Sequence, residues 1–120
     1  MKILIIEDDA IQALSLEMII KKTGIKKIKK VHDASEALDV IAQYKPDLMF
    51  VDINLSSSIS GIDIVKKAQE ESEISVVYIT GNSDSTYRKK AEQTQFIDYL
   101  IKPVHPKVLE NLIAKEMSLN

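Results

Sequence analysis

Cysteine and tryptophan are both missing from this 120-residue sequence. Without cysteine the chain forms no disulfide, no thiol-based active site and no cysteine-bound zinc site. Histidine is scarce, and its two occurrences, His32 and His105, are too few for most histidine-bound metal centres. These absences exclude several large classes of catalytic and structural metal proteins.

Long apolar runs are also absent, and none approaches the roughly 18 residues that a membrane span needs. The N-terminus opens directly into the apolar run Ile3-Leu4-Ile5-Ile6 and has no signal-peptide pattern. Only 5% of the residues are aromatic, which argues against a base-stacking surface, and a formal net charge of -2 gives no overall attraction to nucleic acid or anionic membranes. We expect a cytoplasmic domain that binds neither membranes nor, directly, nucleic acid.

Hydrophobic residues make up 45% of the chain and charged residues 28%, as in ordinary globular proteins. Short apolar runs alternate with amphipathic stretches, which predicts five strands and five helices in one domain. The strands are expected at 2–6, 27–32, 47–52, 74–80 and 96–101, and the helices at about 10–22, 34–45, 62–71, 84–94 and from 105 or 106 onward. The pattern predicts an α/β fold in which helices cover both faces of a parallel sheet.

The first helix is expected to start at Asp9, which suits an N-cap, and to stop at Gly24. Ile11, Leu14 and Met18 form a stripe at helical spacing that predicts a core-facing surface. Further apolar residues spread beyond this stripe, namely Leu16, Ile19 and Ile20. They indicate either a helix wedged deeply against the sheet or an exposed patch, at Leu16 and Ile20, for a partner.

The inward faces of the other helices follow from the same spacing. The residues expected to point into the core are Ala37, Leu38 and Ile41 in the second helix, Ile62, Val65 and Ala68 in the third, and Val108, Leu109, Leu112 and Ile113 in the last. The fourth helix has only Tyr87 and Ala91 to bury and should be the least stable of the five.

Six lysines fall within ten residues around the second strand, at positions 21, 22, 26, 27, 29 and 30. They could bind phosphate backbones or an acidic protein. We interpret them instead as a solvated strand edge that deters strand-to-strand association, because no aromatic residue is interleaved with them.

Polar residues follow several of the predicted strands. Asp8, Asp52, Thr80 and Lys102 all fall at carboxyl ends, which is where open parallel sheets bind ligands. Asp52 anchors this set, because it ends the apolar run Leu48-Met49-Phe50-Val51 and a charge there needs a partner. We therefore expect one site at this edge of the sheet.

Asp8 and Asp52, with Glu7 nearby, would repel one another unless a cation neutralises them. Magnesium suits a set of carboxylates, a backbone carbonyl and waters. A carboxylate beside magnesium can act as a nucleophile toward phosphorus. The Lys102 ammonium and the Thr80 hydroxyl can then contact phosphoryl oxygens. Each residue alone has an ordinary structural explanation, but together they indicate phosphoryl chemistry.

Four segments resemble the receiver domain of two-component response regulators: Ile6-Glu7-Asp8-Asp9, Val51-Asp52-Ile53-Asn54, Ile79-Thr80-Gly81 and Tyr99-Leu100-Ile101-Lys102-Pro103. The resemblance covers the whole chain in order and spacing. It implies a flavodoxin-like (βα)5 fold with strand order 2-1-3-4-5, and a receiver domain that spans residues 1–120 with no output domain after it.

The resemblance also implies roles for individual residues. Asp52 would be the phosphoacceptor, taking phosphate from a histidine of a kinase or phosphotransfer protein, so that the domain is not an enzyme acting on external substrates. Mg2+ would be bound by Asp8, Asp52 and the Asn54 carbonyl, and by Glu7 through water. Thr80 and Tyr99 would form a switch pair with Lys102 as the phosphate-sensing lysine, and Asp9, Gly81 and Pro103 would support the site.

The resemblance implies two binding surfaces as well. The first helix would face the kinase or phosphotransfer protein. The fourth helix, fifth strand and fifth helix, over residues about 84–117, would bind a downstream protein or a second copy of the chain. One departure stands out: the loop over residues 55–61 has no proline and is about one residue longer than in many receivers.

Two other functions fit the sequence less well. A pseudo-receiver that binds without phosphorylation should have lost an acid, the lysine or the hydroxyl, and none is lost here. A phosphohydrolase usually carries its second acidic residue two positions after the nucleophile, at the first strand. Here that position is Asn54, after the third strand, and an amide cannot shuttle a proton.

Overall fold

The computed structural model describes residues 1–56, 58–81 and 85–119. Five parallel strands form one sheet in the order β2-β1-β3-β4-β5. The strands are β1 (Lys2–Ile6), β2 (Lys27–Val31), β3 (Leu48–Asp52), β4 (Ser75–Thr80) and β5 (Asp98–Ile101). The helices are α1 (Ala10–Lys21), α2 (Ala34–Tyr44), α3 (Gly61–Glu71), α4 (Ser85–Ala91) and α5 (Pro106–Leu119). The predicted fold class and strand order are confirmed.

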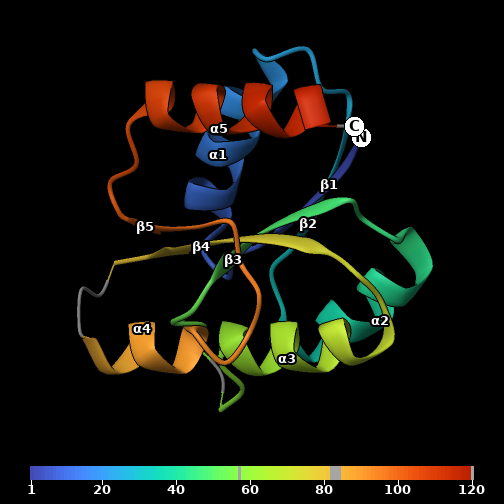
Figure 1. Ribbon diagram of the computed structural model, residues 1–120, viewed down its shortest axis with the longest axis vertical. Coiled ribbons are helices and arrows are strands. Elements are labelled where there is room, and N and C mark those ends of the chain that lie inside the picture. The colour runs from blue at the N-terminus through green and yellow to red at the C-terminus, as the bar shows by residue number, and fades with distance from the viewer. Residues whose placement is uncertain (57, 82–84, 120) are drawn as a thin grey trace.

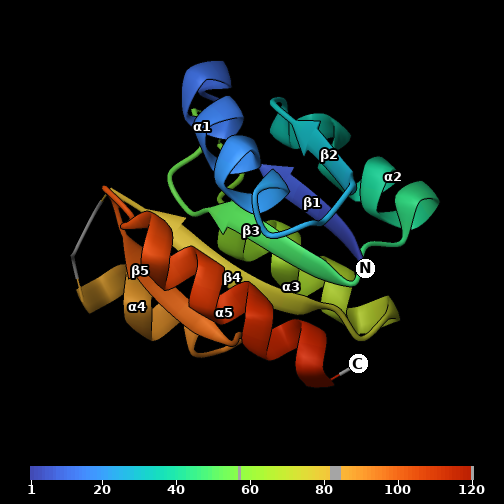
Figure 2. The ribbon, with the colours of Figure 1, turned by 90° about the horizontal axis from the view of Figure 1, so that it is seen from above.

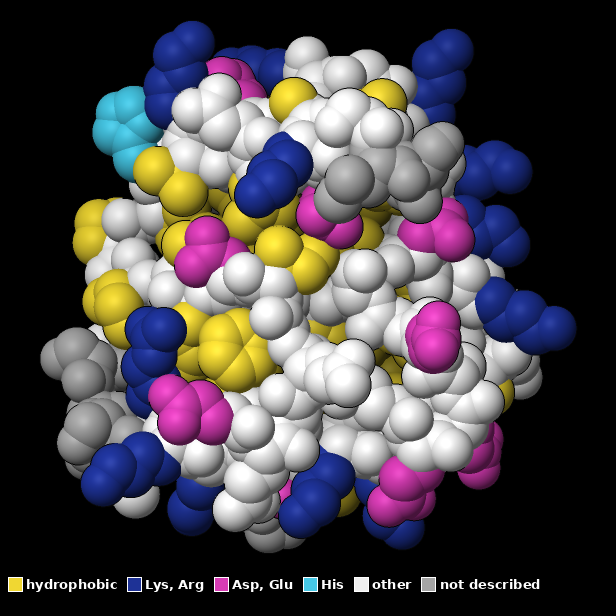
Figure 3. Space-filling model, in the orientation of Figure 1, with side chains coloured by type: hydrophobic (Ala, Val, Ile, Leu, Met, Phe, Trp, Pro, Cys, Tyr) yellow, Lys and Arg dark blue, Asp and Glu magenta, His cyan; other side chains and the backbone are white. Residues whose placement is uncertain are grey.

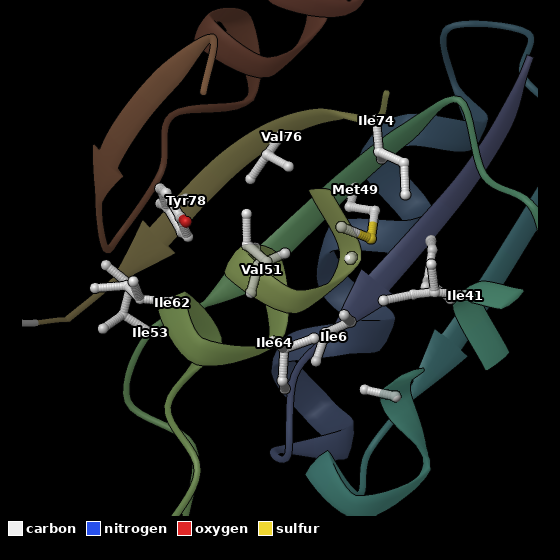
Figure 4. Close-up of a cluster of buried hydrophobic side chains, with 14 of the residues drawn as sticks. Ile6, Ile41, Met49, Val51, Ile53, Ile62, Ile64, Ile74, Val76 and Tyr78 are labelled. Carbon is white, nitrogen blue, oxygen red and sulfur yellow. The ribbon is translucent and has the colours of Figure 1, made fainter. Parts of the chain in front are cut away.

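Helices cover both faces of the sheet. α1 and α5 lie together on one face, and α2, α3 and α4 lie on the other (Figure 1). Each face has its own hydrophobic core, because the strand side chains alternate between the two sides. Figure 4 shows the core on the α2–α3 side, where Ile41, Val51, Ile64, Val76 and Tyr78 pack between sheet and helices. Within the described residues, no helix is both long and apolar enough to cross a membrane.

The orientation predicted for α1 is wrong. Ile11, Leu14 and Met18 are 80%, 48% and 56% exposed, whereas Ala13 and Ile20 are buried. Apolar side chains occur all round this helix, so their spacing does not choose a face, and packing against the sheet and α5 decides it. The exposed patch is therefore Ile11, Leu14 and Met18, and not the Leu16–Ile20 surface that the sequence suggested.

Two further side chains expected in the core lie at its rim. Leu38 is 40% exposed, because α2 turns Ala34, Ala37 and Ile41 inward instead. Val108 is 42% exposed, because α5 presents Leu109 and Ile113 to the sheet. The predicted burial of Ile62, Val65 and Ala68 in α3 is confirmed.

The lysine-rich segment lies along β2, which is an edge strand of the sheet. Lys27 and Lys29 are exposed, while Lys30 forms an ion pair of 2.9 Å with Glu17 of α1. The Lys29 ammonium also lies 5.8 Å from the ring centre of Tyr44. These positions agree with a charged, solvated edge that disfavours pairing with another strand.

α4 is the shortest of the helices and buries little, as expected from its sequence. Ala91 is buried and Tyr87 is half-buried against the core. Asp84, at the start of the helix predicted from the sequence, lies outside the described residues.

Candidate functional site

Seven of the residues singled out by the sequence, Asp9 among them, line one shallow pocket at the carboxyl edge of the sheet. The pocket measures about 390 Å³ and is lined by Glu7, Asp8, Asp52, Asn54, Gly81 and Lys102, together with Asp9 and Gln12. Glu7 and Asp8 directly follow β1, Asp52 ends β3, and Lys102 follows β5. β1 and β3 are neighbours in the sheet, and only β4 separates β3 from β5. Because all of these strands are parallel, their carboxyl ends place the side chains together at one edge.

Three carboxylates meet in this pocket. Each of Glu7, Asp8 and Asp52 offers an oxygen, and these three oxygens lie within 4.8 Å of one another. Glu7 and Asp52 are only 5% and 6% exposed. Buried carboxylates this close repel strongly, and a hard divalent cation with oxygen ligands is the group that best removes the repulsion. The donor set therefore fits Mg2+.

Lys102 bridges two of these acids. Its ammonium nitrogen donates to Glu7 Oε1 at 2.6 Å and to Asp52 Oδ2 at 2.9 Å. Its backbone N–H donates to the Thr80 carbonyl at 2.8 Å and so extends the pairing of β5 with β4. The lysine thus supplies one positive charge against three negative charges.

The charges alter the pKa values in the pocket. Burial raises the pKa of Glu7 to about 7; the hydrogen bond from Lys102 opposes this shift and the neighbouring Asp52 adds to it. Hydrogen bonds from Ser56 lower the pKa of Asp8. Burial alone would lower the pKa of Lys102, but its hydrogen bonds to Glu7 and Asp52 raise it. Glu7 is therefore the acid of the pocket that is poised to change its charge near neutral pH.

Asn54 connects β3 to β4 across the pocket. Its backbone N–H donates to Asp52 Oδ1 at 3.0 Å, which fixes the orientation of the Asp52 carboxylate. Its side-chain amide donates to the Thr80 hydroxyl at 3.1 Å. Thr80 is fully buried at the end of β4. The hydroxyl is thus held beside the pocket by a contact with the loop that follows Asp52.

Tyr99 lies away from the acidic pocket. Its buried ring packs near the rings of Tyr78 and Phe96, with centroid separations of 6.2 and 6.3 Å. The Arg88 guanidinium of α4 lies 5.1 Å from the centre of the Tyr99 ring. The structure therefore brings Tyr99 to α4 rather than to Asp52.

The remaining predicted residues surround the site. Asp9 caps α1, accepting hydrogen bonds from the N–H groups of Ile11 and Gln12 at 2.9 and 3.1 Å. Pro103 follows Lys102 through a cis peptide bond. In the loop after β3, the Ser56 N–H donates to Asp8 Oδ2 at 2.7 Å, so this loop reaches over the acidic cluster. Residue 57 of the loop lies outside the described residues.

Residues 3–114 match the family described as the response regulator receiver domain. The chain belongs to this family. It is 29% identical over 115 residues to the transcriptional regulatory protein BtsR of Salmonella typhi, covering 95% of this chain and 47% of that protein. It is 28% identical over 119 residues to the DNA-binding response regulator MtrA of Mycolicibacterium paratuberculosis, covering 99% of this chain and 52% of that protein. This receiver domain thus spans about half the length of the curated relatives it matches.

A solved structure supports the same assignment. The N-terminal domain of a response regulator/sensory box/GGDEF 3-domain protein from Carboxydothermus hydrogenoformans superimposes with a TM-score of 0.88 and is 26% identical in sequence. The match covers 99% of this receiver domain and 95% of that chain.

One site residue of this receiver domain was missed by sequence reasoning. A Cβ atom on Gly61 would lie 2.2 Å from the Asp52 carbonyl oxygen and 2.7 Å from Val51 Cγ1. The Gly61 N–H donates to the Ile53 carbonyl at 3.1 Å, and a Ser60–Asp63 capping box starts α3 at this point. Only glycine lets α3 begin so close to the strand that carries Asp52. The pattern Ser60-Gly61-x-Asp63 marks the start of a helix, but it does not indicate that position 61 must be glycine.

His32 is a second contact that the sequence did not indicate. Its Nδ1 atom lies 2.9 Å from the Glu7 carbonyl oxygen, and the Glu7 N–H donates to the Val31 carbonyl at 3.0 Å. These bonds hold the Glu7 backbone from the β2 side. No local pattern around His32 marks this role.

Proposed function

We propose that the domain accepts a phosphoryl group on Asp52 and uses it to switch a protein-binding surface. The observation that carries this proposal is the position of the Asp52 carboxylate, with one oxygen held by Lys102 and the other by the Asn54 N–H. Asp52 lines the pocket together with Glu7 and Asp8, and one oxygen of each of the three lies within 4.8 Å of the others. A buried, oriented carboxylate beside an ammonium group is suited to attack phosphorus.

Glu7, Asp8, Asp52 and the Asn54 carbonyl form the set we propose for Mg2+, with Glu7 acting through water. Their carboxylate oxygens are close enough to share one ion. A bound Mg2+ would neutralise charge on the phosphoryl oxygens.

The phosphoryl donor would be a phosphohistidine of a kinase or phosphotransfer protein. An Asp52 carboxylate oxygen forms the new bond to phosphorus, the bond from phosphorus to the histidine nitrogen breaks, and the imidazole leaves with that electron pair. The exposed residues Ile11, Leu14 and Met18 lie on α1, the helix whose N-cap Asp9 and first-turn residue Gln12 line this pocket. They form the surface that we assign to the donor protein. A donor of this kind would work in the cytoplasm.

The response would start at Thr80 and Lys102. A phosphoryl group on Asp52 offers new acceptors to the Lys102 ammonium and to the Thr80 hydroxyl, which now accepts a hydrogen bond from Asn54. A shift of Thr80 would alter the end of β4 and the start of α4. α4 also contacts Tyr99 through Arg88, so Tyr99 would follow α4 as the second member of the switch pair.

The surface that changes would be α4, β5 and α5. Exposed apolar residues of this region include Ile97 just before β5, Ile101 on β5, and Val108 and Met117 on α5. Hydrophobic side chains also show in the middle of the face drawn in Figure 3, between the two helical layers, with charged side chains around them. Such a surface suits a downstream protein or a second copy of the domain.

The test is intact-mass analysis after incubation with a small-molecule phosphodonor, with and without Mg2+. Asp52→Asn removes the proposed nucleophile, and Asp39→Asn, an exposed aspartate of α2, is the matched control. We expect one Mg2+-dependent phosphoryl adduct in the wild type and in Asp39→Asn, and none in Asp52→Asn. An adduct that persists in Asp52→Asn would show that the acceptor is another residue. No adduct in any variant, with Mg2+ binding intact, would favour the phosphorylation-independent binding module.

A further inference from the structure

A second cavity lies next to the acidic pocket, between α1 and α5. It measures about 420 Å³ and is bounded below by the central strands of the sheet. Seen from above, β3 and β4 lie between these two helices (Figure 2). The cavity is far larger than the space that one water molecule occupies in liquid water, roughly 30 Å³.

The walls of this cavity are mostly apolar. Phe50 of β3 and Ile79 of β4 form its floor. The sides are formed by Leu16 and Ile19 of α1 and by Val104, just before α5. Pockets of roughly 300 to 1,000 Å³ with apolar walls and few polar groups are the usual form of small-molecule sites.

The polar groups of the cavity gather at the end that adjoins the acidic pocket. The charged residues that line it are Glu7, Asp52 and Lys102, two acids and one base, which leaves one net negative charge when Glu7 is ionised. Lys102 contacts Glu7 through Oε1, and the Asp9 N–H donates to Glu7 Oε2 at 3.4 Å. A cationic group is the complement of this end, and an apolar body is the complement of the rest.

We propose that this cavity binds a small amphipathic amine. The ring or chain of the ligand fills the space over Phe50 and Ile79, and its ammonium group lies at the carboxylates of Glu7 and Asp52. Burial of the ring or chain against the apolar walls is favourable, which accounts for the body of the ligand. The uncompensated negative charge selects the head group.

The ligand would also oppose metal binding. Its ammonium group and a divalent cation at Glu7, Asp8 and Asp52 would share two carboxylates, so each would weaken the affinity for the other. This consequence rests on the proposed function of the acidic pocket, whereas binding of the amine itself does not.

The experiment compares 4-phenylbutylamine with 4-phenylbutan-1-ol, which share the same apolar body and differ in charge. Binding is measured by NMR shifts of ¹⁵N-labelled protein without Mg2+ or phosphodonor, so the result is independent of whether Asp52 is phosphorylated. Val104→Phe places a larger side chain in the cavity. Val108→Phe makes the same change at a position of α5 that is 42% exposed and does not line the cavity.

We expect the amine to bind with an affinity at least about fivefold higher than the alcohol, in line with one ion pair of about 1 kcal/mol. Val104→Phe should weaken binding of the amine at least about fivefold, and Val108→Phe should leave it unchanged. Circular dichroism checks the fold of each variant, and Ser15→Leu is a second cavity-filling change if Val104→Phe does not fold. Equal affinities for amine and alcohol, or amine binding unaffected by either filling variant, would overturn the proposal. A Mg2+ titration then tests the competition separately.

Discussion

The Lys102 ammonium lies closer to Glu7, at 2.6 Å, than to Asp52, at 2.9 Å. Glu7 is therefore the main partner of the lysine, and Asp52 is its second partner. This arrangement holds Lys102 over the pocket and stabilises two buried carboxylates that would otherwise face each other uncompensated. It also means that Lys102 and a metal ion neutralise the same acids.

Lys102→Met should lower stability without Mg2+ and strengthen Mg2+ binding. Removing the ammonium leaves Glu7 and Asp52 unpaired, at a cost of about 1 to 3 kcal/mol in the free energy of unfolding. It also removes a positive charge near the metal, so a given Mg2+ concentration should stabilise the variant more than the wild type. Urea unfolding with and without Mg2+ measures both effects. Lys107→Met is the control, because Lys107 is exposed and its contact with Glu110 is 4.0 Å long. Its unfolding free energy should change by less than about 0.5 kcal/mol.

The protonation of Glu7 should make stability depend on pH. Its pKa is raised from 4.5 to about 7 in the folded chain, chiefly by burial. The folded state therefore binds the proton more tightly than the unfolded state, and the stability from this group is fully present below pH 4.5 and lost as the pH rises through 7. The loss is on the order of 3 kcal/mol.

Glu7→Gln isolates this contribution, because glutamine does not titrate. Melting temperatures of both proteins between pH 4.5 and 8, without Mg2+, should show the wild type losing stability relative to the variant as the pH rises. Parallel pH profiles for the two proteins would contradict the assignment of the raised pKa to Glu7.

Gly61→Ala should be strongly destabilising and Gly81→Ala nearly neutral. The new methyl group at position 61 would meet the Asp52 carbonyl oxygen at 2.2 Å, whereas the one at position 81 would meet no atom of the described residues within 4 Å. Overpacking against a rigid backbone costs about 1 to 3 kcal/mol. Because the clash is with the backbone of Asp52, Gly61→Ala should also slow phosphorylation by a small-molecule donor. Similar unfolding free energies for the two variants would refute the close approach of α3 to β3.

The sequence predicted that the acidic residues and Lys102 meet at one edge of the sheet, because the signals for this are local. Asp52 and Lys102 each directly follow an apolar run, and parallel strands necessarily bring their carboxyl ends to one edge. Two features could not be predicted in this way: which face of α1 is buried, and that position 61 must be glycine. α1 is apolar on several sides, so its packing depends on α5, about 90 residues later in the sequence. The need for glycine at position 61 depends on how closely α3 approaches β3, which no local pattern reports.

The two faces of α1 should respond differently to mutation. Ile20→Ala removes a fully buried side chain and should cost about 2 to 5 kcal/mol of stability. Ile11→Ser changes a side chain that is 80% exposed and should leave the unfolding free energy within about 0.5 kcal/mol of the wild type. If α1 binds the donor protein, Ile11→Ser should slow phosphotransfer from that protein and leave the reaction with a small-molecule donor unchanged. If the variant slowed both reactions equally, Ile11 would affect the reaction in the pocket and not the contact with the donor protein.

Residues 85–94 should exchange their amide hydrogens faster than α3. Among the α4 side chains whose burial the structure describes, only Ala91 is fully buried, so opening the helix exposes little apolar surface and costs little free energy. Its C-terminal end is tied down: the Thr94 hydroxyl lies 2.7 Å from the Tyr78 hydroxyl and 2.6 Å from the Ala91 carbonyl oxygen. The N-terminal part of α4 should therefore exchange fastest, and the helix should move about its anchored end.

Thr94→Val tests this anchor, because valine has a similar shape and cannot make either hydrogen bond. In hydrogen-exchange mass spectrometry of the variant, the two ends of α4 should exchange their amide hydrogens at similar rates, while α3 stays protected. If residues 85–94 rank among the best-protected segments of the wild type, α4 is too stable to be shifted by the few contacts that a phosphoryl group adds at Thr80. The switch would then have to run through β5 and α5 without α4.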